Sequence, residues 1–405
     1  MREARMCCDK GTVEAGPELL TGVSLPAAVI HEAPLAQNLE WMQCFVDDHG
    51  ARLAPHGKTT MAPALFHRQL EAGAWGITLA TAPQCRAAFA HGVTRLLMAN
   101  QLVGEVNMAM VAALIEGGAD YYCVVDGVEN VSQLGRFFAA RGLKLQVLIE
   151  LGLPGGRCGC RDTEQVEALV AAIAEQPALA LVGIEGYEGM IAGGDEIAAV
   201  RAYGERLVET VRSLVDSGLL ACEAPIVTAS GSKWFDLIAE AFDNAALRER
   251  YTPVLRPGCY VVHDHKLYAG AMAEVKARHP HLQGELRPAL EIFAHVQSLP
   301  EPGLAIIALG KRDIGHEPDL PLPLRRYPVI SHPAAATTPV DVSDCHTTHI
   351  MDQHLFLAIP QNAGIAVGDV VAFGTSHPCL TFDKWRQLLL VDEALKVKES
   401  LVTCF

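Results

Sequence analysis

Basic residues are scarce in this sequence. Among 405 residues, 32 Lys and Arg stand against 47 Asp and Glu, which gives a net charge of −15 at pH 7. The basic residues also form no continuous stripe along the chain. Binding to nucleic acid depends on a basic patch that faces the phosphates. We therefore expect no nucleic-acid partner.

Long apolar runs are lacking as well. The longer uninterrupted stretches, such as residues 178–184 and 304–309, fall far below the roughly 20 residues that cross a bilayer. The N-terminal segment contains no apolar core of a signal peptide. Together these absences predict a cytoplasmic protein that is not bound to a membrane.

The chain has no low-complexity segment and no repeat of fixed period. Its 35 Gly and 23 Pro are spread between apolar runs, and half of its residues are hydrophobic, so it can bury a sizeable core. Its 12 cysteines are expected to be mostly reduced and buried, because no signal peptide accompanies them. Cys158 and Cys160 form an isolated Cys-x-Cys, which is a weak indication of a metal site without a second pair.

Strand-like and helix-like segments alternate through the first two thirds of the chain. The strand-like segments are residues 51–55, 76–80, 95–99, 122–126, 145–150, 180–186, 226–229 and 253–256. Helix-like stretches separate them, for example residues 84–90, 165–174 and 195–214. Repeated alternation of this kind predicts an α/β fold, specifically a (β/α)8 TIM barrel.

The pattern changes after residue 265. Strand-like segments then follow one another with Pro and Gly turns between them, at residues 290–297, 304–309, 367–373 and 387–391. This predicts a second, mainly β C-terminal domain. We assign residues 26–265 to the barrel, and residues 1–25 together with 266–405 to the β domain.

Lys58 follows the first predicted barrel strand, at the strand end where TIM barrels carry their functional residues. Pro55 and Gly57 precede it closely, and a helix-like run begins at Pro63. A lysine that is held in one place and partly desolvated suits imine formation, because the free amine attacks a carbonyl. The alternative is an ordinary solvated loop lysine.

Two turns predict an anion site on the same rim. Residues 230–232, Ser-Gly-Ser, lie between a strand and a helix-like run, where backbone N–H groups and hydroxyls can bind an anion. The same sequence also occurs as a common helix N-cap. Residues 256–258, Arg-Pro-Gly, follow the next strand, and phosphate sites of TIM barrels use the seventh and eighth loops.

His377 and Cys379 lie in the β domain on either side of Pro378. A residue before proline prefers an extended conformation, so the two side chains can point the same way. An imidazole and a thiolate together form half of a zinc site. The alternative is a turn with a buried cysteine.

Six short motifs follow one another along the chain. They are Pro55-His56-Gly57-Lys58-Thr59, Gly155-Gly156-Arg157-Cys158-Gly159, Ser230-Gly231-Ser232, Arg256-Pro257-Gly258-Cys259-Tyr260, Asp352-Gln353-His354, and Ser376-His377-Pro378-Cys379 with Phe382-Asp383-Lys384-Trp385. In this order they resemble the D-serine dehydratase and D-threonine aldolase family of fold-type III pyridoxal-phosphate enzymes, which are relatives of alanine racemase. The resemblance runs from about Leu25 to Val391.

The resemblance implies a role for each matching residue. Lys58 would carry pyridoxal 5'-phosphate, Arg157 would bond the phenolic oxygen of this cofactor, and Tyr187 would lie near its ring. The residues that would hold the phosphate are Ser230, Gly258, Cys259 and Tyr260. His377 and Cys379 would bind Zn²⁺ or another divalent metal such as Mn²⁺.

The resemblance also implies a reaction on a small D-amino acid. The amine of Lys58 would remove the α-proton and the metal would stabilise the departing hydroxide, so that D-serine or a related D-3-hydroxyamino acid yields a 2-oxo acid and ammonia. Lys58, His377 and Cys379 would be the catalytic residues. Relatives in this family are homodimers in which the β domain of each subunit faces the barrel mouth of the other, so we expect a homodimer.

Two other activities stay open. The first is a metal-dependent D-threonine aldolase that releases glycine and acetaldehyde; Met190 occupies the stretch where a histidine base of the aldolases is expected. The second is a cofactor carrier with a structural zinc site, which would need four ligands where the sequence offers two.

Overall fold

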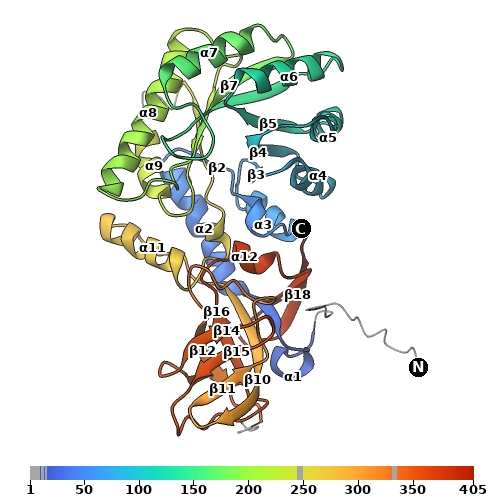
Figure 1. Ribbon diagram of the computed structural model, residues 1–405, viewed down its shortest axis with the longest axis vertical. Helices are drawn as coiled ribbons and strands as arrows, with labels where there is room; N and C mark the ends of the chain where they lie inside the picture. The colour runs from blue at the N-terminus through green and yellow to red at the C-terminus, as the bar shows by residue number, and fades with distance from the viewer. Residues whose placement is uncertain (1–9, 11–12, 14–15, 244–249, 331–334) are drawn as a thin grey trace, which may run out of the picture. The chain divides into compact units, whose positions relative to one another are not determined.

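The computed structural model describes residues 10, 13, 16–243, 250–330 and 335–405 (Figure 1). The chain divides into two compact units, each built from segments far apart in the sequence. The barrel unit contains Met42–Lys58 and Phe66–Gly258. The β unit contains Met1–Trp41, Thr59–Leu65 and Cys259–Phe405.

Eight parallel strands form the sheet of the barrel unit, in the order β2-β9-β8-β7-β6-β5-β4-β3. They are β2 (Arg52–Leu53), β3 (Ile77–Leu79), β4 (Arg95–Gln101), β5 (Asp120–Val125), β6 (Leu145–Leu151), β7 (Leu179–Gly186), β8 (Ile226–Ala229) and β9 (Thr252–Leu255). An isolated parallel bridge between His56 and Thr78 joins the two ends of this order. The sheet is a curled barrel, which confirms the predicted (β/α)8 architecture, and each strand ends within two residues of its predicted bounds.

Helices follow the strands in alternation and lie outside the sheet (Figure 1). They are α2 (Glu32–Asp48), which crosses the boundary between the units, and α3 (Pro63–Glu71), α4 (Ala82–Ala90), α5 (Glu105–Glu116), α6 (Val128–Ala139), α7 (Thr163–Ala174), α8 (Glu196–Asp216) and α9 (Phe235–Phe242). All eight residues of β7 are buried, as expected for a parallel strand covered on both faces. Leu97, Val124, Leu148 and Val254 belong to one buried apolar cluster contributed by several strands.

Ten strands form the sheet of the β unit. They are β1 (Ala27–His31), β10 (Leu290–Glu301), β11 (Leu304–Ile307), β12 (Leu322–Tyr327), β13 (Val340–Asp341), β14 (His346–Ile350), β15 (Leu355–Ala358), β16 (Val370–Gly374), β17 (Gln387–Val391) and β18 (Val397–Val402). The described helical segments here are α1 (Leu19–Gly22), η1 (Gly57–Thr59) at the unit boundary, η2 (Cys259–Val261), α11 (Leu267–Arg278) and α12 (Cys379–Phe382). The predicted mainly β C-terminal domain is confirmed.

The strand β1 comes from the start of the range that the sequence assigns to the barrel. It nevertheless pairs antiparallel with β10 and parallel with β17, because Ala27 to Ile30 are apolar and buried on this second sheet. Residues 1–9, which the sequence places with the β domain, lie outside the described residues.

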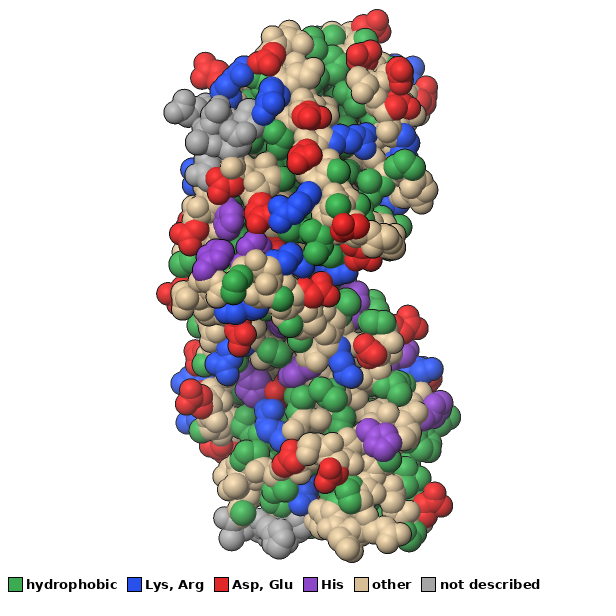
Figure 2. Space-filling model, turned by 90° about the vertical axis from the view of Figure 1, so that its left-hand side faces the viewer, with side chains coloured by type: hydrophobic (Ala, Val, Ile, Leu, Met, Phe, Trp, Pro, Cys, Tyr) green, Lys and Arg blue, Asp and Glu red, His purple; other side chains and the backbone are tan. Residues whose placement is uncertain are grey.

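The surface charges and the cysteines agree only in part with what the composition predicts. On the face that Figure 2 shows, Lys and Arg side chains are interspersed with Asp and Glu. The ten cysteines within the described ranges are all free thiols, as expected, but only five of them are buried. No helix in the described part of the chain has both the length and the apolar character needed to cross a membrane.

Candidate functional site

The predicted site residues of the barrel unit all follow the carboxyl ends of strands. They are Lys58 after β2, Arg157 after β6, Tyr187 after β7, Ser230 after β8 and Gly258 after β9. Because the strands are parallel, these loops open on one rim of the barrel. The fold therefore brings together residues that are up to two hundred positions apart.

Lys58 lies in the short helical turn η1 directly after β2. A Cβ atom at Gly57 would approach Phe66 and Ile77 to 2.7 Å, so a glycine is needed for the chain to pass at this point. The side chain of Lys58 is exposed, which differs from the partial desolvation that the sequence predicts. The backbone of the lysine is thus fixed by packing, while its amine is accessible.

His56 lies two residues before Lys58 and was not predicted as a site residue. Its Nδ1 atom is buried and has no hydrogen-bond partner among the described residues. Burial lowers the pKa of this imidazole well below its usual value, and the nearby charges of Arg256, Lys58 and Arg157 lower it further. His56 is therefore a neutral imidazole beside the lysine.

The turn after β8 is strained. Ser230 has a φ of 88°, in the left-handed region that favours glycine, and it is fully buried. Its Oγ atom has no hydrogen-bond partner in the described part of the chain. The N–H of Gly231 donates to Oε1 of the buried Glu188 at 2.6 Å, which braces the turn. A buried, unpartnered hydroxyl held in this way fits an oxygen of a phosphate group.

A hydrogen bond connects this turn to the one after β9. The N–H of Gly258 donates to Oγ of Ser232 at 3.2 Å. Cys259 and Tyr260 follow in the turn η2, which belongs to the β unit, and both are buried. The two turns that the sequence predicts to form an anion site are therefore neighbours.

A buried layer of charge lies at the carboxyl ends of the strands. Arg256 is 1% exposed, forms an ion pair with Glu185 on β7 and donates to the carbonyl oxygen of Gly186 at 2.8 Å. Glu185 and Glu150 are partners in the register of β6 and β7. Burial and the neighbouring Glu185 raise the pKa of Glu150 to about 7. The sequence indicates this layer only by Glu150 and Glu185, which are charged residues within the apolar strands β6 and β7.

Arg157 and Tyr187 contact each other. The guanidinium carbon of Arg157 lies 4.3 Å from the centre of the Tyr187 ring, a cation–π arrangement. The N–H of Tyr187 donates to the hydroxyl of Tyr203 on α8 at 3.0 Å. The two residues that the resemblance places around a cofactor ring therefore form one pair.

Two other polar residues of the rim have local roles. The side chain of Thr81 accepts from the N–H of Gln84 and caps α4. The amide of Asn100 donates to the carbonyl oxygen of Ala80 at 2.7 Å. These contacts explain both residues as structural.

The β unit carries a cluster of two sulfur atoms. Sγ of Cys379 lies 3.6 Å from Sγ of Cys259 and 3.4 Å from Oγ1 of Thr59, the residue that follows Lys58 in the chain. The hydrogen bond between Cys259 and Cys379 lowers the pKa of the Cys379 thiol well below its usual value; His377 lowers it further, while burial opposes both. A lowered pKa favours the thiolate, which is the form that binds metals.

His377 and Cys379 meet on a different backbone from the one predicted. Pro378 is helical, with φ −59° and ψ −42°, and Cys379 begins the helix α12, so the segment is not extended. The two side chains are nevertheless close enough for His377 to lower the pKa of the Cys379 thiol. Within the described residues, no group of three or more His, Cys, Asp or Glu side chains could hold a metal ion. An imidazole and a thiolate therefore form an open, two-ligand donor set that suits Zn²⁺.

Known protein families match both parts of the chain. The profile of the alanine racemase N-terminal domain matches residues 30–251, and that of a serine dehydratase domain matches residues 289–391. The chain is 29% identical to D-threonine aldolase of Arthrobacter sp. over 220 residues, which cover 54% of this chain and 58% of that protein. It is 28% identical to D-threo-3-hydroxyaspartate dehydratase of Delftia sp. over 252 residues, 61% of this chain and 63% of that protein. The matched region thus spans less than two thirds of these two relatives.

Solved structures show the same fold over nearly the whole chain. D-threonine aldolase from Filomicrobium marinum superposes with a TM-score of 0.81 at 23% identity, covering 96% of this chain and 98% of that one. Two alanine variants of D-threo-3-hydroxyaspartate dehydratase superpose with a TM-score of 0.76 at 22% and 23% identity, covering 96% of this chain and 97% and 99% of theirs. One variant replaces a histidine; the other replaces a cysteine two positions later and is in the metal-free form.

Proposed function

Since the chain belongs to the alanine racemase N-terminal domain family, we propose that it is a pyridoxal-phosphate-dependent lyase that acts on D-3-hydroxyamino acids. The proposal depends mainly on one observation. At the rim of the barrel, the accessible side chain of Lys58 occurs together with the buried hydroxyl of Ser230, which has no hydrogen-bond partner among the described residues. The relatives named above are lyases for D-threonine and for D-threo-3-hydroxyaspartate, which supports this substrate class.

The residues present fit the cofactor. Lys58 would attach it, the hydroxyl of Ser230 would bond its phosphate, and Arg157 with Tyr187 would flank its ring. Gly258 is hydrogen-bonded to Ser232, Cys259 and Tyr260 follow it in the chain, and these three residues would complete the phosphate site. When bound, the cofactor withdraws electrons from the α-carbon of an amino acid. The amine of Lys58 would be the base that takes the α-proton.

We favour dehydration over aldol cleavage because of His377 and Cys379. The spacing of this pair equals that of the histidine and cysteine replaced in the two dehydratase variants. Zn²⁺ at this pair would supply a Lewis acid for the departure of the β-hydroxyl group. D-Serine or a related D-3-hydroxyamino acid would then yield a 2-oxo acid and ammonia.

Aldol cleavage is the second candidate. The identity of 29% with a D-threonine aldolase favours it. An aldolase needs a base at the β-hydroxyl, and Met190, with half of its surface exposed, stands in the stretch where the family resemblance predicts a histidine. Met190 offers no basic group, so the side chains favour dehydration.

Product analysis tests the proposal. The purified protein, supplied with pyridoxal phosphate and Zn²⁺, is incubated with D-serine, D-threonine and D-threo-3-hydroxyaspartate, with the L-isomers as controls. We expect pyruvate, 2-oxobutyrate and oxaloacetate respectively, each with one ammonia. Glycine as the main product from D-threonine would establish the aldolase activity instead.

Borohydride reduction forms the second part of this test. Reduction should abolish the visible absorption of the bound cofactor and attach the cofactor permanently to the protein. The modified residue should map to Lys58. The Lys58→Ala variant should show neither, whereas Lys311→Ala, an exposed lysine of the β unit, should behave as the wild type. Labelling of another lysine contradicts the proposed site.

A further inference from the structure

The loop between β6 and α7 carries Arg157 and closes on itself. At its base, the N–H of Gly152 donates to the carbonyl oxygen of Cys160 at 2.9 Å, and the N–H of Cys160 donates to that of Glu150 at 2.7 Å. Gly155 and Gly156 lie within it, next to Arg157. The base of the loop is therefore fixed by these hydrogen bonds. The segment with the two glycines, just before Arg157, could by itself adopt many conformations.

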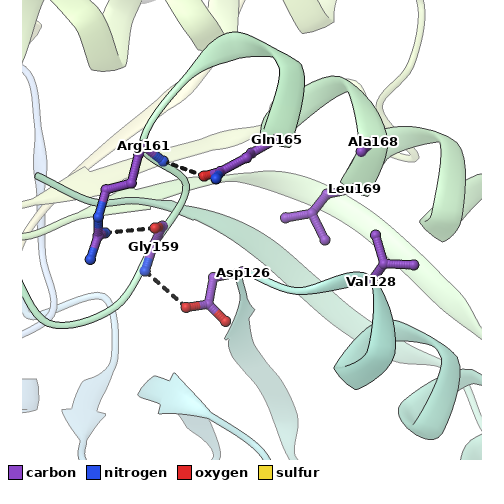
Figure 3. A pocket seen from close by; sticks show the side chains of 7 residues that line it. All are labelled: Asp126, Val128, Gly159, Arg161, Gln165, Ala168 and Leu169. Atoms are coloured by element: carbon purple, nitrogen blue, oxygen red, sulfur yellow. Dashed lines mark hydrogen bonds between the residues drawn. The ribbon is translucent and has the colours of Figure 1, made fainter. Parts of the chain in front are cut away.

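Arg161 removes this freedom. Its guanidinium donates to four successive carbonyl oxygens, those of Gly156 at 3.0 Å, Arg157 at 3.0 Å, Cys158 at 2.6 Å and Gly159 at 2.6 Å. Figure 3 shows the side chain of Arg161 and its hydrogen bond to Gly159. The planar guanidinium has five N–H donors in a rigid fork, so four such bonds orient every peptide group around Arg157.

Asp126 provides a second anchor from another strand end. Its Oδ2 atom accepts the N–H of Gly159 at 2.9 Å (Figure 3). Gly159 has a φ of 95°, and a Cβ atom there would lie 2.4 Å from the backbone nitrogen of Gly152, so no other residue fits. The loop is therefore held by Arg161 from within the loop's own sequence and by Asp126, which follows β5.

Arg157 itself is exposed, and its guanidinium packs on the ring of Tyr187. Its direction thus depends on the conformation of the loop. We infer that Arg161 and Asp126 are positioning residues that aim Arg157 at the bound cofactor; this inference rests on the proposed function.

A double-variant experiment separates positioning from general stabilisation. Pyridoxal phosphate is titrated into the cofactor-free wild type, Arg157→Gln, Arg161→Gln and the protein with both changes, and the visible absorption is recorded. Arg161→Gln should weaken binding about tenfold, as Arg157→Gln does, and the two changes together should weaken it no more than Arg157→Gln alone. Arg136→Gln, an exposed arginine on α6, is the control and should leave binding unchanged. The inference would be overturned if the two changes together lowered the affinity for pyridoxal phosphate by the product of their separate effects. It would also be overturned if Arg161→Gln bound pyridoxal phosphate as tightly as the wild type.

Failure of the proposed function would look different, because the wild type would then bind no pyridoxal phosphate at all. Trypsin cleavage after Arg157 in the cofactor-free protein provides a readout that needs no cofactor, and Arg161→Gln should accelerate it at least several-fold. Asp126→Asn, which keeps an acceptor for Gly159, should retain most of the affinity for pyridoxal phosphate, whereas Asp126→Ala should lose it. Equal affinity of these two variants, or unchanged cleavage in Arg161→Gln, contradicts the positioning of Arg157 by Arg161 and Asp126.

Discussion

At the scale of single residues, Ser230 is expected to lower the stability of the cofactor-free protein and to favour binding of a phosphate group. Its left-handed backbone costs about 1 kcal/mol in a non-glycine residue, and its buried hydroxyl lacks a partner within the described residues. Both features lower the stability of the cofactor-free protein. Both are explained if the hydroxyl receives a phosphate oxygen.

Replacements of Ser230 should separate the two effects. Ser230→Gly and Ser230→Ala both lose the hydroxyl, so each should bind pyridoxal phosphate at least tenfold more weakly. Only the glycine relieves the backbone, so it should be more stable than the alanine variant by about 1 kcal/mol. Urea unfolding of the cofactor-free variants measures this difference. Equal stability of the two variants would show that the backbone at Ser230 is not strained.

The sequence indicates some site residues and conceals others for a physical reason. Lys58 and Ser230 can be found because each follows an apolar strand and stands next to glycine. His56, Glu188 and Arg161 cannot, because their roles depend on contacts with loops that are distant in the sequence or on backbone atoms. The sequence alone does not show whether a histidine is buried or lies on the surface.

At the scale of elements, three strands of the β unit share one buried ionic cluster. His31 on β1 and Arg325 on β12 each contact the carboxylate of Glu291 on β10 at 2.9 Å. Burial alone would raise the pKa of Glu291, but the hydrogen bonds from His31 and Arg325 outweigh it and lower that pKa to about 2. The carboxylate therefore joins strands that are far apart in the sequence.

This cluster predicts an acid-dependent stability. A folded-state pKa below the unfolded value contributes stability above the unfolded pKa, and this contribution, roughly 3 kcal/mol, is lost as the pH falls from about 4.5 to about 2. Glu291→Gln should therefore destabilise the protein by roughly 3 kcal/mol at pH 7 and by progressively less toward pH 2. Urea unfolding across this range measures the difference. Glu301→Gln, an exposed glutamate on the same strand, is the control; a penalty independent of pH contradicts the role of the carboxylate.

The barrel strands were predictable and several β-unit strands were not. Strands β4 to β9 are apolar segments bounded by glycine or helix-like runs, and burial on both faces gives them a strong signal. By contrast β14 reads His-Thr-Thr-His-Ile and is largely exposed, and β12 contains a proline. Such strands depend on hydrogen bonds to their neighbours, which the local sequence does not record.

At the scale of the whole molecule, we propose a homodimer. Val103, Val106 and Val128 are 54%, 78% and 48% exposed and follow the carboxyl ends of β4 and β5, at the barrel rim. Exposed apolar side chains at such a rim are often covered by another chain. A second copy of this chain would bury them.

Val106→Asp should weaken this association at least tenfold, because it would bury a carboxylate in the interface. Sedimentation should give a dimer for the wild type and a monomer for the variant at the same micromolar concentration. Val402→Asp, which changes an exposed valine on β18, is the control. A wild-type monomer with full activity would exclude a functional dimer.

The shortest strand of the barrel, β2, precedes Lys58. Strand β2 shares two residue pairs with β9, and an isolated bridge at His56 joins its other side to β3, whereas β6 and β7 share seven pairs. Because β2 has so few paired residues, the position of Lys58 depends strongly on the packing of Phe66 and Ile77 against Gly57. If Lys58 holds the cofactor as proposed, local packing rather than the sheet fixes its point of attachment, while the turns after β8 and β9 are held by their own hydrogen bonds.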